Sequence, residues 1–281
     1  MTIEFKWDRL KALLHTMGSA VLAYSGGVDS SVVLRAASEA AVFPFIAVTA
    51  VSETYPAGEL GSAQEFARSL GATHQILHTG ELSSEEFLRN SPDRCYYCKR
   101  ELFGKLTQIA EQEGITFVLD GSNADDLSDH RPGRRAALEF SVRSPLIEAG
   151  FSKAEVRECA RSLGLPVWDK PSLACLSSRI PYGTRITPGI LQTVQTAEDL
   201  LHTFGFRQVR VRHHGDTARI EVDRSEFGLL LADGLAKKVT ASLKELGYTY
   251  VCLDLGGYRT GSMNEGIKYR SQESVVRSQE E

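Results

Sequence analysis

The sequence lacks the long apolar segments of a membrane protein and the net positive charge of a general nucleic-acid binder. No apolar run approaches the ~20 residues that a membrane-spanning helix needs, and the N-terminal residues lack the uninterrupted apolar stretch of a signal peptide. The formal net charge of -4 restricts any polyanion site to a local basic patch. We therefore expect a globular cytoplasmic protein that acts without a membrane or a nucleic-acid partner.

Cysteine is also scarce, at five residues in a chain of 281. An odd number in a chain of this length argues against the disulfide framework of a secreted protein and indicates a reducing compartment, in which thiols stay free for metal binding or catalysis. Internal repeats and low-complexity tracts are absent. The hydrophobic content of 42% suffices for packed cores, and the length suggests roughly two domains.

The first half of the chain alternates β-rich runs with helical patterns. Such alternation predicts βαβ units and a doubly wound α/β domain with a parallel sheet. A further helix should begin at Ser152, which forms a capping box with Glu155, and its apolar stripe makes Cys159 a core residue. The predicted strands are SAVLAY (19–24), FIAVTAV (45–51), THQILH (73–78) and TFVLDG (116–121), with a helix at 95–113 before the last.

The second half has a different order of elements, which predicts a smaller α+β domain. We place the doubly wound α/β domain at 1–167 and the α+β domain, with a polar and frayed tail after about residue 262, at 168–281. Residues 166–189 contain several prolines and glycines, which predict a loop. The elements expected after it are a helix at 190–204, strands FRQVRVRHH (206–214) and ARIEVD (218–223), a helix near 232–246 and strand TYVCLDL (249–255).

The segment YSGGVDSS, residues 24–31, stands between the first strand and its helix. Two glycines allow a tight turn, and hydroxyl groups at a helix N-terminus favour a bound phosphate. The lysine of a Walker A loop and the G-x-G-x-x-G of dinucleotide folds are both missing. SGGVDS after an apolar strand resembles the PP-loop of the ATP pyrophosphatases, which adenylate a substrate oxygen and release pyrophosphate. The resemblance implies that the ATP phosphates are held by Ser25, Gly26, Gly27, Asp29 and Ser30, with Asp29 helping to place Mg²⁺.

DGSNADD, residues 120–126, follows a predicted parallel strand and should lie beside the phosphate loop, at the edge where open α/β sheets bind ligands. Asp125 and Asp126 could coordinate Mg²⁺ there, or could belong to a solvated turn. The following VRSPLIEAGFSKAEVRECARSLGLP is similar to a segment of several PP-loop enzymes, which makes Arg143 and Lys153 candidate phosphate contacts.

Three cysteines lie outside apolar patterns. Cys95 and Cys98 occupy neighbouring positions at the start of a helix, and Cys175 lies among serines, prolines and arginines in a predicted loop. A zinc ribbon would need a second pair of ligands, and a thioredoxin-like pair would need another fold. Three thiolates can instead hold an iron-sulfur cluster that keeps one iron open, or they can be unrelated. Cys252, in the predicted strand TYVCLDL, is expected to be a packing residue rather than a ligand.

Several motifs together resemble the LarE family, in this order and over nearly the whole chain. They are the phosphate loop, DRCYYCK, DGSNADD, RPGRRAALE, SPL, KPSLACLSSRIPYGTRIT and LGGYRTGSMNE. Members of that family are ATP-dependent sulfur transferases that make the organic part of the nickel-pincer cofactor of lactate racemase. The resemblance implies adenylation of a carboxylate of pyridinium-3,5-biscarboxylic acid mononucleotide, followed by attack of a sulfur nucleophile.

The resemblance also distinguishes two sulfur sources. Members with one cysteine sacrifice its sulfur, whereas three-cysteine members hold a [4Fe-4S] cluster whose open iron carries an extra sulfide. Cys95, Cys98 and Cys175 match the second kind, with Cys175 as the catalytic position. A sulfide donor and a homo-oligomer are further expectations.

Substrate contacts are expected in the second domain. The period of two along FRQVRVRHH puts Arg210 and Arg212 on one strand face, where guanidinium groups can bind phosphate or carboxylate. The resemblance adds acidic residues near this strand and an anion site in GGYRTG. The matching positions are Glu198, Glu221, Asp223 and Arg259.

Three other functions remain open from the sequence. A tRNA thiolation enzyme shares the adenylation chemistry but needs a larger basic surface. An amide-forming synthetase shares SGGVDS but needs no thiol at Cys175. A nucleotide sensor or metallochaperone would release no pyrophosphate.

Overall fold

The computed structural model describes residues 1–56, 58–127, 132–171, 174–232, 234–259 and 261–263. They divide into two compact units, Met1–Leu173 (unit 1) and Ala174–Glu281 (unit 2). Within the described ranges, every helix is too short or too polar to cross a membrane. The tail predicted to fray lies, from residue 264 on, outside the described residues.

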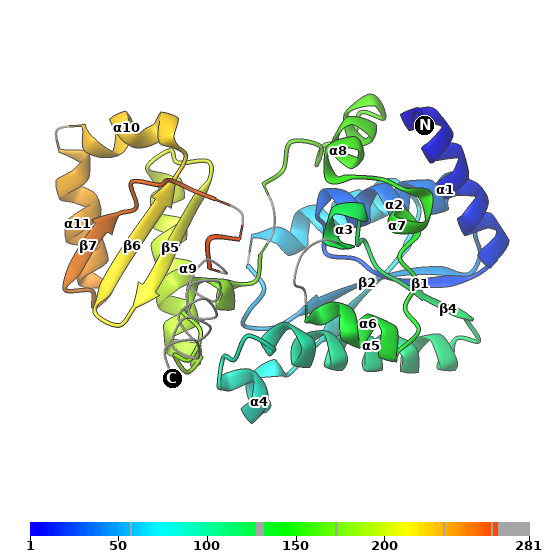
Figure 1. Cartoon of the computed structure of the whole chain (residues 1–281), viewed down its shortest axis with the longest axis horizontal. Helices are drawn as coiled ribbons and strands as arrows, with labels where there is room; N and C mark the ends of the chain where they lie inside the picture. Colours follow the sequence, from blue (N-terminus) through cyan, green and yellow to red (C-terminus); the bar gives the residue numbers. More distant parts are fainter. Residues whose placement is uncertain (57, 128–131, 172–173, 233, 260, 264–281) are drawn as a thin grey trace, which may run out of the picture. The chain divides into compact units, whose positions relative to one another are not determined.

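Unit 1 is built on a sheet of four parallel strands (Figure 1). The strand order is β3-β2-β1-β4, so the chain runs outward from β1 to β3 and then returns to place β4 on the other side of β1. In register, Ala20 of β1 lies between Phe45 and Phe117. The strands are β1 (Ala20–Ala23), β2 (Phe45–Val51), β3 (Thr73–His78) and β4 (Phe117–Leu119).

Helices cover both faces of this sheet, because successive strand residues point to opposite faces and both sets are apolar. Leu22 and Ala47 belong to one core with the helices α1, α2, α3, α7 and α8. Val21 and Ile46 belong to the opposite core, with α5 and α6. Figure 1 shows the two layers of helices on the two sides of the sheet. The architecture is α/β, as the sequence predicts.

The helices of unit 1 follow the predicted order, and α5 and α8 lie within one or two residues of their predicted bounds. The helices α1, α4, α6 and α7 have no counterpart among the predicted elements, although the capping residue Thr2 and the helical spacing of Trp7, Leu10 and Leu14 are local signals for α1. The bounds are α1 (Ile3–Met17), α2 (Val28–Glu39), α3 (Glu59–Ser69), η1 (Glu81–Ser83), α4 (Glu85–Leu88), α5 (Arg94–Gln112), η2 (Ala124–Leu127), α6 (Gly133–Glu139), α7 (Pro145–Ala149) and α8 (Lys153–Ser162).

Unit 2 packs helices against a three-stranded sheet of order β5-β6-β7, in which β5 and β6 are antiparallel and β6 and β7 are parallel. Val209 and Val211 of β5 point into the apolar core of unit 2. The alternate residues Arg210 and Arg212 lie on the other face of the strand, where they are also buried. The bounds are η3 (Leu176–Arg179), α9 (Pro188–Thr203), β5 (Val209–His214), β6 (Thr217–Val222), η4 (Arg224–Glu226), α10 (Phe227–Leu231), α11 (Leu235–Glu245) and β7 (Tyr250–Leu253).

The two cysteines assigned to cores differ in outcome. Cys159 of α8 is 2% exposed, which confirms the prediction. Cys252 is exposed, so its predicted packing role is wrong. The reason is the period of two along β7, which directs Val251 and Leu253 toward the core and Tyr250 and Cys252 outward.

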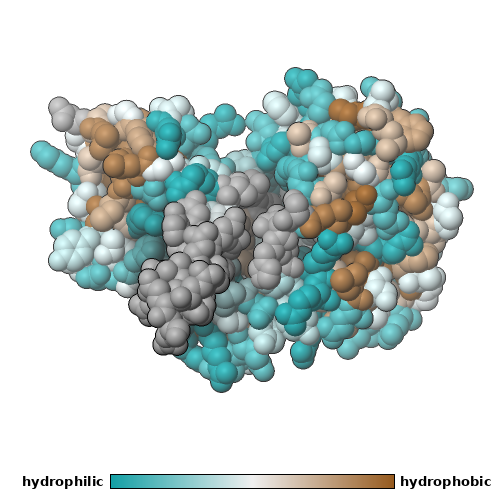
Figure 2. All heavy atoms as spheres, viewed as in Figure 1, coloured by the Kyte–Doolittle hydropathy of each residue, from teal (hydrophilic) through white to brown (hydrophobic). Residues whose placement is uncertain are grey.

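The surface of unit 2 also carries exposed apolar residues. Figure 2 shows apolar side chains gathered at the end of unit 2 where α10 lies, and further apolar areas over unit 1. Leu229 and Leu231 of this helix are 44% and 64% exposed.

Candidate functional site

The phosphate loop is a compact turn between β1 and α2. Gly26 has a φ of +74°, which favours glycine, and a Cβ there would lie 2.8 Å from the Cβ of Ala63 in α3. The hydroxyl of Ser25 accepts the amide of Gly27 at 3.3 Å, and that of Ser30 accepts the amide of Ser25 at 3.3 Å. The first amides of a helix have no partner within it, so the N-terminus of α2 is available to an anion.

Two carbonyl groups of the loop accept hydrogen bonds from side chains outside its motif. Tyr55 donates its hydroxyl to the carbonyl of Ser25 at 3.2 Å, and Lys170 donates to the carbonyl of Gly26 at 3.4 Å. Burial, followed by the charge of Glu59, raises the pKa of Tyr55 to about 12, so that its hydroxyl remains a donor at neutral pH. These contacts bind two carbonyl groups of the loop and do not involve the first amides of α2.

The loop after β4 lies directly against the start of α2. A Cβ on Gly121 would be 2.9 Å from the backbone nitrogen of Ser30, so only glycine fits at this approach. The side-chain amide of Asn123 donates to a carboxylate oxygen of Asp29 at 3.2 Å. The structure therefore brings DGSNADD to the phosphate loop, as the parallel sheet predicts.

The N-terminus of α8 completes this arrangement. Ser152 and Glu155 form the predicted capping box, and the side chain of Lys153 forms an ion pair with Asp29. The backbone amide of Lys153 donates to Asp125 at 3.0 Å. Of the predicted ATP contacts, the structure thus gathers the loop residues, Asp125 and Lys153.

Arg143 is the exception, because its guanidinium makes no contact with the phosphate loop among the described residues and binds elsewhere. Its guanidinium is bound to the carboxylate of Glu148 and lies 5.6 Å from the ring centre of Phe117. Phe117 pairs with Ala20 at the amino end of the sheet, whereas the phosphate loop follows the carboxyl end of β1. The backbone of Arg143 pairs with Leu119 at the carboxyl end of β4, but its guanidinium lies toward Phe117, nearer the amino end of that strand.

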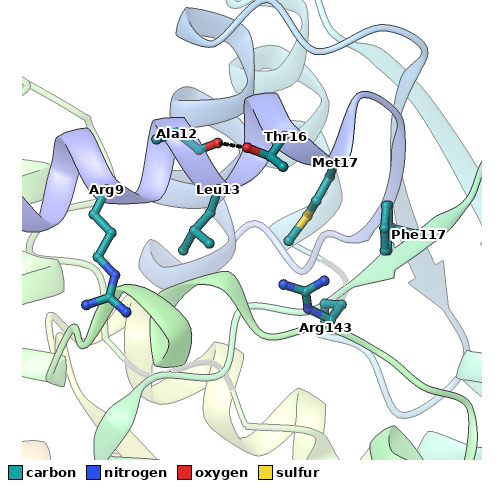
Figure 3. A pocket seen from close by; sticks show the side chains of 7 residues that line it. All are labelled: Arg9, Ala12, Leu13, Thr16, Met17, Phe117 and Arg143. Carbon is teal, nitrogen blue, oxygen red and sulfur yellow. Dashed lines mark hydrogen bonds between the residues drawn. The ribbon is translucent and has the colours of Figure 1, made fainter.

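Arg143 instead lines a cavity of about 280 Å³ beside α1. Figure 3 shows Leu13 and Met17 pointing from α1 to the same side, with the guanidinium groups of Arg9 and Arg143 apart from each other. The lining residues are Arg9, Ala12, Leu13, Thr16, Met17, Phe117 and Arg143.

Cys95 and Cys98 lie in the first turns of α5, whose N-terminus favours thiolates. Cys95 is exposed and Cys98 half-buried. The thiol of Cys98 lies 3.6 Å from a carboxylate oxygen of Glu81, which is 5% exposed. Within neither unit do three or more His, Cys, Asp or Glu residues of the described ranges form a metal-binding group.

Cys175 belongs to unit 2, where it precedes η3 and is partly exposed. Its backbone is fixed by the buried guanidinium of Arg179, which donates to the carbonyls of Ala174 at 2.7 Å and of Cys175 at 3.1 Å. The same guanidinium forms a bidentate pair with Glu198 at 2.9 and 2.7 Å. Glu198 also accepts the amide of Val211 at 2.9 Å, so this carboxylate ties the turn to β5.

The other buried pair of unit 2 reaches the same turn. Arg212 binds Glu221 through two hydrogen bonds of 3.0 and 2.6 Å and donates to the carbonyl of Ser178 at 2.8 Å. Arg210 lies over the ring of Tyr258 at 5.3 Å. Its pKa is lowered, first by burial and next by the charge of Arg179. The structure thus brings together the predicted residues Glu198, Arg210, Arg212 and Glu221. The carboxylates of Glu198 and Glu221 are already paired with the guanidinium groups of Arg179 and Arg212.

The two remaining predicted residues are more exposed. Asp223 caps η4 by accepting the amide and hydroxyl of Ser225 at 2.9 and 2.6 Å, and these bonds lower its pKa. Arg259 lies 3.5 Å from Asp254, which also faces Arg219 at 3.6 Å. Arg219 also lies 3.1 Å from Glu221, so Arg259 and Asp254 are connected through it to a buried pair.

Sequence reasoning did not single out Lys170 or Arg179. Both lie within the stretch DKPSLACLSSR that surrounds Cys175. No local pattern reveals them, because their partners Gly26 and Glu198 come from elsewhere in the chain.

Comparison with known proteins agrees with the fold and the phosphate loop. Residues 19–164 match the asparagine synthase family. An uncharacterized protein of Synechocystis sp. is 41% identical, over 93% of this chain and 98% of the relative. The pyridinium-3,5-bisthiocarboxylic acid mononucleotide synthase of Lactiplantibacillus plantarum is 40% identical, over 95% of this chain and 96% of the relative. A tRNA-specific 2-thiouridylase of Xanthobacter autotrophicus is 31% identical over 54% of this chain and 48% of its own length.

Such relatives, together with a phosphate loop at the carboxyl edge of a parallel sheet, define the class as ATP-using sulfurtransferases of the PP-loop type. Within that class, the chain belongs to the family of pyridinium-3,5-bisthiocarboxylic acid mononucleotide synthases, the LarE family.

Proposed function

We propose that this protein adenylates the carboxylates of pyridinium-3,5-biscarboxylic acid mononucleotide with ATP and replaces an oxygen by sulfur, for nickel-pincer cofactor biosynthesis and lactate racemase maturation. The observation that carries the proposal is the 40% identity to the Lactiplantibacillus plantarum synthase over nearly the full length of both chains. A similarity of this extent includes both units, whereas the thiouridylase similarity covers about half of either chain.

ATP binds at the phosphate loop in this proposal. The amides at the start of α2 and the hydroxyls of Ser25 and Ser30 bind phosphate oxygens, and Gly26 and Gly27 let the backbone approach. Lys153 neutralises charge beside Asp29, to which it is paired. Mg²⁺ takes few carboxylates when it also binds phosphates, and Asp29 with Asp125 supplies that donor set.

The sulfur comes from a [4Fe-4S] cluster held by Cys95, Cys98 and Cys175. The donor set fits, because two thiols share the first turns of α5 and the third is partly exposed. When bound, the cluster supplies sulfide at the iron that no protein ligand occupies, and a separate sulfide donor replenishes it. Arg179 fixes the backbone of Cys175. A fixed backbone suits a cluster ligand that has to keep its position through repeated turnovers.

The substrate binds at the arginines of unit 2. Arg210 and Arg212 are buried, and Arg210 is repelled by Arg179, so a phosphate or carboxylate near Arg210 relieves like-charge repulsion. Arg259 is a second anion contact. Glu221, Glu198 and Asp223 act by orienting neighbouring groups, since each already accepts hydrogen bonds.

The protein acts as a cytoplasmic homo-oligomer in this proposal. The exposed leucines of α10, together with the hydrophobic patch at that end of unit 2, support a contact between copies there.

The first test measures iron and acid-labile sulfide per chain after anaerobic purification. Wild type should hold about four irons per chain, and Cys95→Ala, Cys98→Ala and Cys175→Ala should each lose them. Cys252→Ala is the matched control, because that thiol is exposed on β7 and outside the proposed set. An iron-free protein that still transfers sulfur would instead assign Cys175 a sacrificial role, visible as a mass loss of one H₂S.

A second test decides the acceptor. Pyrophosphate release should require the pyridinium mononucleotide and should not respond to tRNA. Release that depends on tRNA would replace this proposal by tRNA thiolation, which the partial similarity to thiouridylases favours as the alternative.

A further inference from the structure

Lys170 lies at the phosphate loop without belonging to its motif. Its ammonium group forms an ion pair with Glu59 in the first turn of α3, and the two side chains are only 18% and 23% exposed. The same group lies 3.4 Å from the carbonyl of Gly26. A cation is therefore held within hydrogen-bonding distance of the turn that is proposed to receive the phosphates.

The backbone around Lys170 is fixed independently of its side chain. Arg157 of α8 donates to the carbonyl of Trp168 at 2.9 Å and to that of Lys170 at 2.8 Å. The ammonium group can therefore change partners while the chain to which it is attached stays in place. Movement of a few flexible side-chain bonds suffices.

Glu59 also lies close to the loop through its own helix. Gly26 packs against Ala63, one turn after Glu59 in α3, at a distance that admits no Cβ. A carboxylate at this place repels a polyphosphate, and Lys170 screens it. The arriving phosphates compete with Glu59 for the same ammonium group.

We propose that Lys170 is a phosphate-binding residue held in reserve by Glu59, and that it transfers its ammonium group from this carboxylate to a phosphate oxygen when ATP binds. The inference rests on the proposed ATP-dependent function and adds a residue to its nucleotide site. The exchange involves no covalent change.

The proposal predicts that substitutions of the two members of this ion pair change the affinity for MgATP in opposite directions. Lys170→Gln removes a charge-assisted contact with phosphate and should weaken MgATP binding about tenfold. Glu59→Gln removes a competitor and a repulsive charge and should tighten MgATP binding about threefold. Lys170→Arg keeps the charge and should retain most of the affinity. A pair that is only structural would instead weaken binding in both variants.

The measurement is calorimetric titration of each full-length variant with MgATP and with adenosine, which has no phosphate. Adenosine affinity should be the same in all variants. Lys11→Gln and Glu39→Gln are the matched controls, because they break a half-buried Lys–Glu pair of α1 and α2, far from the loop at the other end of α2, and should leave both affinities unchanged.

Weaker MgATP binding in Glu59→Gln, or equal loss of ATP and adenosine affinity in Lys170→Gln, would overturn the proposal. If Lys170→Gln fails to fold, Glu59→Gln and Lys170→Arg still decide it. Wild type that binds ATP but transfers no sulfur would refute the proposed function alone, whereas wild type without ATP affinity would refute both.

Discussion

At the scale of single residues, a buried ion pair helps to fix the turn that contains Cys175. Arg179 and Glu198 have side chains that are 3% and 6% exposed, and their bidentate pair also holds two backbone carbonyls and one amide. Removing one member of such a pair leaves an uncompensated buried charge, whereas replacing both leaves none.

Arg179→Met is therefore expected to lower the free energy of unfolding by about 3–5 kcal/mol. The double variant Arg179→Met/Glu198→Leu should recover a large part of this loss, which urea unfolding of the metal-free protein can measure. A double variant less stable than either single variant would show that the pair contributes more than it costs to bury.

The same residues show how far the sequence can predict the site. The phosphate loop was predictable because its turn, its hydroxyls and the N-terminus of α2 are contiguous. Glu198 and Glu221 were predicted near Arg210 and Arg212, but their pairing with arginines was not. Lys170 and Arg143 depend on partners brought together by the fold, and no spacing rule encodes those contacts.

At the scale of elements, the N-terminus of α8 connects the phosphate site to α1. Lys6 of α1 is buried and donates to the carboxylate of Glu155, the residue that closes the capping box of α8. The hydrogen bond from Lys6, followed by that from the backbone of Ser152, lowers the pKa of Glu155 from 4.5 to about 2.

This contact predicts a pH-dependent stability. Because the folded pKa is depressed, the stabilisation is fully present above the ordinary pKa of 4.5 and is lost as the pH falls toward about 2. Lys6→Met should therefore destabilise the protein above about pH 5, and its difference from wild type should shrink below pH 4.5. Urea unfolding across this range measures it. A difference that stays constant down to about pH 2 would refute the assignment to Glu155.

The approach of the β4 loop to α2 predicts a second effect. Gly121→Ala forces a Cβ against the backbone of Ser30 and should cost about 1–3 kcal/mol of unfolding free energy, with weaker ATP binding. Gly61→Ala in α3 is the matched control, because its Cβ meets nothing within 4 Å and the change should stabilise the helix by about 0.5–1 kcal/mol. Equal effects of the two variants on ATP affinity would exclude steric displacement of α2.

At the scale of the whole molecule, the five cysteines differ in accessibility. Cys159 is buried, and burial raises its pKa to about 11, whereas Cys95 and Cys252 are exposed. Alkylation of the metal-free native protein should therefore modify Cys95 and Cys252 and spare Cys159 until the protein unfolds. Peptide mass mapping at increasing urea measures this order. Early modification of Cys159 would show that α8 opens in the native state.

The return of the chain from β3 to β4 has a consequence for the evolution of such enzymes. Because β1 lies between β2 and β4, the loops after β1 and β4 meet at the carboxyl edge of the sheet, where Gly121 approaches Ser30, and then lead to helices on opposite faces. The order of the strands, rather than any one side chain, creates the place where the phosphate loop and DGSNADD meet. A lineage can therefore exchange the domain that follows this sheet and keep the arrangement of the two loops unchanged.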